Sequence, residues 1–258
     1  MFFEIMDMGI SLHFAMQFLL FLLVILPPLL YYYITGRWYA PSVYRRNSTV
    51  YYLIFGGILA PLLSIVLVDY VYRLFTLPGS IRFTFFDYRG FVIIPFVEEL
   101  VRGSLLLLLF LIFRTRDVKA TTLLGGVFGV MFASVENYFY FGIYTGSESG
   151  YPSFVVQRLL LTTPIHIALS AMLSGLIALI YEYIVPKREG NNSVGAVTKR
   201  LSLVAFAIIF IQHLHFLWNF HTQITPISLE SVAVFVVIMI IFFAHLKKSK
   251  SLDSGERV

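Results

Sequence analysis

The sequence predicts an all-α membrane protein that crosses the bilayer several times. Of its 258 residues, 59% are hydrophobic and only 13% are charged, and the mean hydropathy is +0.84. An ordinary soluble domain carries about 25% charged residues, so this chain is too apolar to be one. In addition, seven stretches reach the roughly 18 apolar residues that mark a spanning helix.

The seven stretches fill the chain and leave no room for a separate soluble domain. We therefore predict a single transmembrane domain over residues 1–258, with a short disordered tail at 247–258. We expect the first stretch to be a retained span, because Glu4 and Asp7 precede it in place of the basic residues of a signal peptide. The predicted spans are Leu12–Tyr33, Val50–Tyr72, Phe91–Phe113, Leu123–Ile143, Phe154–Tyr181, Leu201–Phe220 and Ile227–Leu246.

Loop charge predicts the orientation of this multi-pass protein in the cell membrane. Fourteen Lys and Arg residues follow the first, third, fifth and seventh stretches, whereas the N-terminus and the alternate loops hold three. The positive-inside rule then places the N-terminus outside and the C-terminus in the cytoplasm. The net charge of +5 lies in loops and tail rather than on one face, which argues against a nucleic-acid partner. The chain has no cysteine, so thiol catalysis is excluded.

Ionisable side chains inside the predicted spans are the clearest functional signal. Each costs roughly 2.5 to 3.5 kcal/mol to insert, so each needs a partner or a function. The third stretch carries Glu98 and Glu99, and Arg102 shares a helical face with both. The fourth carries Glu136 and Asn137. Small residues precede these at four-residue spacing and allow a neighbouring helix to approach closely. They are Gly125, Gly129 and Ala133.

Histidines follow on the next two stretches. The fifth carries His166, and the sixth carries His215 and Asn219, which are four residues apart on one helical face. His213 points to another side of that helix, and we expect it to take no part. A rise of 1.5 Å per residue places the carboxylates and histidines in the outer half of the membrane, so we expect them to line one cavity.

Carboxylates and histidines together are the usual groups for activating water. One group acts as general base, and imidazole or amide N–H groups can hold the oxyanion. The same side chains can bind zinc, with His166, His215 and Glu136 as the alternative ligand set. The His-Glu-x-x-His spacing is absent and the two histidines lie on separate helices, which favours a site without a metal or other cofactor. Gly-x-Ser-Gly and aspartates near a span centre are also absent.

In this order, the motifs resemble those of the PrsW family of intramembrane proteases, relatives of the CAAX-processing (Abi) proteases. The resemblance covers a core of about 91–220 and implies Glu98 or Glu99 as base, with His215 and Asn219 as oxyanion donors. The family cuts membrane proteins, including an anti-sigma factor, near the outer face, so the implied partners are a transmembrane substrate and the lipid bilayer. The motifs are Glu98-Glu99-x-x-Arg102, Phe132-x-x-x-Glu136-Asn137-x-x-Tyr140, His166 and His215-x-x-Trp218-Asn219.

The chain departs from its relatives at two positions. Glu136 stands where the CAAX-processing proteases have a histidine, so His166 would have to supply the imidazole. Arg102 replaces a lysine of many PrsW members and keeps the counter-charge, and Asn137 has a supporting place. The prediction is an intramembrane endopeptidase that cuts near the outer side of the bilayer. The alternatives are a non-catalytic scaffold, like the seven-span gamma-secretase subunit, and an ion-coupled transporter, although no inverted repeat is evident.

Overall fold

The computed structural model describes residues 25–31, 33–35, 48–75, 93–113, 117–143, 151–185, 193–224, 232–242 and 244. Throughout these ranges the chain is helical apart from single residues at helix ends, and no strand occurs in them. The predicted all-α class is therefore confirmed. The predicted tail at 247–258, most of the first predicted span and both ends of the last lie outside the described residues, and Val232–Phe242 within the last span forms a shorter apolar helix.

Four described segments are long and apolar enough to cross a membrane. They match the second, fourth, fifth and sixth predicted spans and run Ser48–Val71, Val118–Phe141, Ser153–Ile184 and Val194–Phe220. Helix α6 (Ile94–Phe113) matches the third predicted span and is a 20-residue apolar helix that carries three ionisable side chains, those of Glu98, Glu99 and Arg102. The total of seven spans and the orientation of the termini stay predictions.

Two helices begin well before the apolar stretches that predicted them. These are α7 (Val118–Ile143) and α10 (Val194–Ile224). In front of α7, the Asp117 carboxylate accepts a hydrogen bond from the Ala120 N–H at 2.9 Å and so caps the helix. The hydroxyls of Thr121 and Thr122 donate to carbonyls one turn back, which accommodates them in the helix. Hydropathy thus located the membrane part of each helix and missed its polar start.

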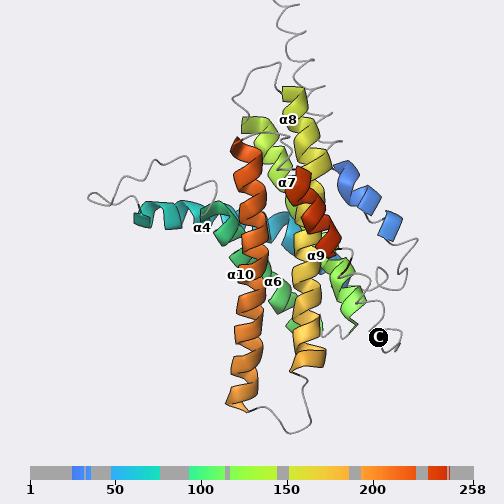
Figure 1. Cartoon of the computed structure of the whole chain (residues 1–258), viewed down its shortest axis with the longest axis vertical. Helices are drawn as coiled ribbons and strands as arrows, with labels where there is room; N and C mark the ends of the chain where they lie inside the picture. The colour runs from blue at the N-terminus through green and yellow to red at the C-terminus, as the bar shows by residue number, and fades with distance from the viewer. Residues whose placement is uncertain are drawn as a thin grey trace, which may run out of the picture.

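Seven further elements join into two long helices, the first with one π-helical turn and the second with two, and shorter helical segments lie at 25–31, 33–35 and 232–242. The first consists of α3 (Ser48–Ile54), η1 (Phe55–Leu59) and α4 (Ala60–Phe75). The second consists of α8 (Tyr151–Gln157), η4 (Arg158–Thr162), α9 (Thr163–Leu179) and η5 (Ile180–Ile184). Figure 1 shows α7, α9 and α10 running along the long axis of the molecule, while α4 turns away from them.

Helices α7 and α9 pack closely because of the glycines that the sequence singled out. A Cβ on Gly125 would lie 2.4 Å from the Cβ of Ser174, and one on Gly129 would lie 2.4 Å from the carbonyl oxygen of His166. Real Cβ atoms essentially never approach so closely, so only glycine permits this spacing. The predicted close approach of a neighbouring helix is confirmed, and it brings His166 next to the face of α7 that carries Glu136.

A second close contact aligns α6 with α10. A Cβ on Gly103 would lie 2.6 Å from the Ile208 side chain. Glu99 stands one turn before Gly103 on α6, and His215 stands about two turns after Ile208 on α10. Because the two helices are antiparallel, this contact brings the histidine to the level of the glutamate. Leu106, Phe128 and Leu169 lie in the buried apolar core formed by α6, α7 and α9.

Candidate active site

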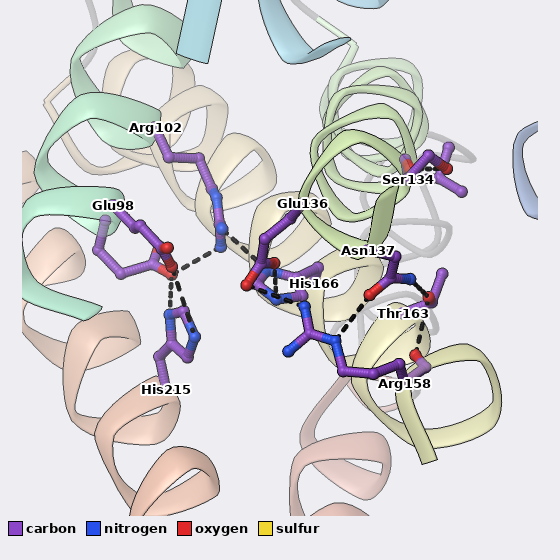
Figure 2. Close-up of polar contacts among 11 residues, drawn as sticks. Glu98, Arg102, Ser134, Glu136, Asn137, Arg158, Thr163, His166 and His215 are labelled. Carbon is purple, nitrogen blue, oxygen red and sulfur yellow. Dashed lines mark hydrogen bonds and ion pairs between the residues drawn. The ribbon is translucent and has the colours of Figure 1, made fainter. Parts of the chain in front are cut away.

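The ionisable side chains that the sequence placed at membrane depth meet in one buried cluster (Figure 2). Glu98 and Glu99 come from α6, Glu136 from α7, His166 from α9 and His215 from α10. The structure confirms that they converge, since each lies within 4 Å of another member of the cluster. Their individual chemical roles stay predictions.

Arg102 is the central cation of the cluster. Its Nη1 donates to Glu99 Oε1 at 2.6 Å, and both side chains are 0% exposed. Its Nη2 lies 2.9 Å from His166 Nδ1. A guanidinium can only donate, so Nδ1 of His166 accepts and the neutral ring carries its proton on Nε2. The guanidinium also lies 4.6 Å above the centre of the Phe132 ring, which supports it from the other side.

His166 joins Arg102 to Glu136. Its Nε2 lies 2.9 Å from Glu136 Oε2, so both ring nitrogens face charged partners. Figure 2 shows Arg102 and His166 between Glu98 on one side and Arg158 on the other. With both nitrogens occupied, His166 has neither a lone pair nor an N–H available to a water in this arrangement.

His215 has one occupied nitrogen and one that faces Glu98. Its Nδ1 lies 2.7 Å from Glu99 Oε1, and a carboxylate accepts, so Nδ1 carries a proton. Its Nε2 lies 3.8 Å from Glu98 Oε2, longer than a direct hydrogen bond. The rings of His166 and His215 meet edge to face at 5.1 Å between centres.

Arg158 is a member of the cluster that the sequence analysis missed. Its Nη2 lies 2.9 Å from Glu136 Oε1, and its Nε donates to Asn137 Oδ1 at 2.8 Å. Asn137 in turn donates to the hydroxyl of Thr163 at 2.9 Å. The sequence could have pointed to Arg158, because Arg102 and Arg158 are the two of the 19 Lys and Arg residues that fall inside predicted spans. The predicted supporting place of Asn137 fits these contacts.

A cavity of about 340 Å³ adjoins the cluster between α4, α6 and α7. Of the five side chains expected to line one cavity, Glu98 and Glu136 line this one, whereas Glu99, His166 and His215 lie behind them in the cluster and are not part of its lining. The lining is otherwise mostly apolar: Pro61, Ser64, Ile65, Val68, Ile94, Phe132, Phe139 and Tyr140. The cavity therefore gives a molecule from outside a path to Glu98.

The last motif of the sequence lies on α10. Asn219 is half-buried one turn after His215, and Trp218 is buried in the core. His213 is exposed on another side of the same helix, as expected for a residue outside the cluster.

Comparison with known families shows which family the chain belongs to. Residues 45–246 match the family described as PrsW family intramembrane metalloprotease, and this match spans most of the chain. The chain belongs to the PrsW family. It is therefore an integral, multi-pass membrane protein and a protease. Neither a curated protein nor a solved structure matches it.

The PrsW family is described as a family of metalloproteases, which implies a metal site. The side chains of this cluster show whether they could form one. Among the described residues, no three His, Asp or Glu side chains are arranged to share an ion. The predicted zinc ligands His166 and Glu136 face each other, and guanidinium groups occupy His166 Nδ1 and Glu136 Oε1. A metal competes poorly for lone pairs that already bind cations. The donors as arranged here do not fit a metal.

Proposed function

We propose that this PrsW-family protease hydrolyses peptide bonds with a water held between Glu98 and His215. The observation that carries the proposal is the 3.8 Å separation between Glu98 Oε2 and His215 Nε2 beside the cavity. One water can bridge two groups at this distance, with hydrogen bonds of ordinary length to each. Among the described residues, Glu98 Oε2 is buried and has no hydrogen-bond partner, so it can accept one from a water.

Charge pairing supports Glu98 rather than Glu99 as the general base. Glu99 pairs with Arg102 at 2.6 Å, and Glu136 pairs with Arg158 at 2.9 Å. Among the described residues, no guanidinium pairs with Glu98. A carboxylate held by a cation is a weak base, because its charge is already compensated, whereas Glu98 keeps its basicity for a proton from water.

Glu99 then acts as a positioning residue for His215. It accepts from Nδ1 at 2.7 Å and so leaves the Nε2 lone pair of a neutral ring directed at the space beside Glu98. This division of labour matches the pairing of a carboxylate with a catalytic histidine in other hydrolases. It also departs from two expected roles, because His215 here accepts from the water instead of donating to the oxyanion, and the two nitrogens of His166 face Arg102 and Glu136.

The reaction follows from these positions. Glu98 takes a proton from the water while His215 Nε2 accepts its other hydrogen bond, and the oxygen attacks the peptide carbonyl. The oxyanion forms within reach of α10, where the Asn219 amide supplies a donor as the family resemblance implies. When the carbon–nitrogen bond breaks, Glu98 returns its proton to the leaving amine. The products are a carboxylic acid and an amine, and the protein is regenerated.

The substrate and the side of cleavage follow from the membrane setting. A cluster at membrane depth meets peptide bonds of other membrane-spanning segments, so we propose that substrates are transmembrane proteins. The distribution of Lys and Arg between the loops supports a site in the outer half of the bilayer.

The test is cleavage of a library of single-span peptides by the purified full chain in proteoliposomes. Glu98→Gln is expected to lower cleavage by about 10²- to 10⁴-fold, the usual contribution of a general base. The matched control is Glu182→Gln, the same change sixteen residues after His166 on one continuous helix, roughly 24 Å away. It is expected to leave cleavage unchanged.

Two results would remove this mechanism. Full activity of a folded Glu98→Gln variant would exclude Glu98 as base. Loss of activity with a strong chelator, together with loss of stoichiometric zinc, would replace it by metal-assisted hydrolysis. Retention of activity in chelator is the expected result.

A further inference from the structure

We infer that the cavity between α4, α6 and α7 is the subsite that receives an apolar substrate side chain next to the scissile bond. This inference rests on the proposed function, because it places the bond beside Glu98. It adds the class of side chain that lies next to the cleaved bond and the face of the molecule through which the substrate enters.

The cavity exists because α4 diverges from α7. At η1, which precedes α4, the backbone is in direct contact with α7, since a Cβ on Gly56 would lie 2.5 Å from the carbonyl oxygen of Phe128. Further along, α4 turns away from the upright helices (Figure 1). The space that opens is lined by Ser64 and Val68 from α4 and by Phe132 and Phe139 from α7.

The cavity opens towards the lipid-facing surface. Two of its lining residues are also exposed, Ile65 by 51% on α4 and Phe139 by 44% on α7. Large apolar side chains at the rim of an opening suit contact with lipid or with a membrane-spanning segment. A substrate helix can therefore approach from within the bilayer and pass a side chain between α4 and α7 towards Glu98.

The size and lining of the cavity define what it accepts. A volume of about 340 Å³ is at the small end for ligand pockets, which start near 300 Å³, and suits a side chain such as leucine or phenylalanine with adjoining backbone. The carboxylates lie at one part of the lining, and apolar side chains form most of the rest. An acidic side chain would meet Glu98, which no guanidinium neutralises among the described residues. The geometry thus favours an apolar residue.

Ser64 provides a polar group within this lining. Its side chain is buried, and its hydroxyl has no hydrogen-bond partner among the described residues. A substrate helix must unwind before its peptide bond can be attacked, and its freed carbonyl and N–H groups then need partners inside the membrane. The Ser64 hydroxyl is placed to bind one of them.

The experiment compares substrates that carry alanine or phenylalanine on either side of the scissile bond. Val68→Phe fills the cavity and is expected to lower kcat/KM for the phenylalanine substrate at least about tenfold relative to the alanine substrate. Val68→Ala enlarges it and should shift the ratio the other way. The matched control is Val66→Phe, because Val66 lies on the same helix, is 64% exposed and does not line the cavity. It should leave the ratio unchanged.

Ser64→Ala tests the hydroxyl and is expected to lower kcat/KM for both substrates by about two- to tenfold without changing their ratio. An unchanged rate would overturn that contact. If neither Val68 variant changes the ratio while Glu98→Gln remains inactive, the subsite is wrong and the proposed function stands. If the wild-type chain cleaves nothing in the library, the proposed function fails first. Val68→Ala keeps the test decisive where Val68→Phe does not fold.

Discussion

Replacing Gly129 by alanine should damage the site without touching any of its polar side chains. The new Cβ would lie 2.4 Å from the carbonyl oxygen of His166 and 2.8 Å from the Ser170 side chain. Ordinary van der Waals contact begins at 3.4 Å, so α7 and α9 must separate by about 1 Å. The opposing oxygen belongs to the backbone of a helix and cannot turn aside as a flexible side chain can.

The magnitude follows from that displacement. Overpacking of a tight interface costs about 1–3 kcal/mol of stability. A separation of α7 and α9 by about 1 Å would also lengthen the contact that His166 makes with Glu136, now 2.9 Å, beyond hydrogen-bond range. A misplacement of this size near reacting groups can reduce a rate by about 100-fold. We expect both effects in Gly129→Ala.

The control is Gly195→Ala at the start of α10, where an added Cβ meets nothing within 4 Å. Alanine gains up to about 1 kcal/mol of helix propensity in a helix interior and less at a helix start, so a lower stability of Gly129→Ala than of Gly195→Ala reports the clash. Chemical unfolding in detergent should show Gly129→Ala about 1–3 kcal/mol less stable than Gly195→Ala, and the cleavage assay should show it about 100-fold slower. Equal stability and equal rates in the two variants would refute the reasoning.

Two further predictions concern the arginines. Arg102→Gln should lower the free energy of unfolding by about 3–5 kcal/mol, because it leaves Glu99 buried without its cation, and the double variant with Glu99→Gln should recover most of this loss. Unfolding curves of the wild type and these two variants decide it, and an unchanged single variant would contradict the pairing. Arg158→Lys keeps the charge but cannot contact Glu136 and Asn137 together, so kcat/KM should fall about tenfold while stability stays within about 1 kcal/mol of wild type. Equal kcat/KM for the two proteins would show that the fork geometry of Arg158 is not needed.

The convergence of the cluster could be predicted from the sequence because the membrane makes isolated charges costly. Ionisable side chains on four successive apolar stretches had few ways to avoid that cost other than meeting one another. The glycines of α7 were informative for a similar physical reason, since small residues within an apolar helix allow a neighbour to approach. Both inferences depend on the spacing of residues along a helix and on the lipid that surrounds it. Spacing and apolar composition can both be read directly from the sequence.

The division of roles between Glu98 and Glu99 could not be predicted in the same way. Adjacent residues on a helix differ by about 100° in direction, and Arg102 is within reach of both by spacing. Which of them pairs with Arg102 depends on where α10 and the cavity lie around α6, a fact of tertiary packing. The same applies to the imidazoles, since only the structure directs both nitrogens of His166 at charged partners and one nitrogen of His215 at Glu98.

Arg158 and the cavity were missed for different reasons. Arg158 lies near the end of a predicted span, where an arginine can extend to the polar interface and is ordinarily unremarkable. In the structure, Thr163 caps the C-terminal end of the π-helical turn η4, and both its N–H and its hydroxyl donate to the Arg158 carbonyl. The cavity arises from the divergence of α4 and α7 beyond Gly56, and no apolar pattern in either helix distinguishes a diverging pair from a packed one.

The arrangement of charges connects the stability of the site with its proposed chemistry. Three carboxylates and two guanidinium groups lie in the cluster, and the two close ion pairs satisfy Glu99 and Glu136. Burying a charge without a partner is costly, so a cluster built for stability alone would have paired or replaced the third carboxylate. Glu98 instead lies beside the cavity, where a water or a substrate can reach it. Glu136 also lines the cavity but is paired with Arg158, so among the described residues Glu98 is the carboxylate that combines access from the cavity with the lack of a guanidinium partner.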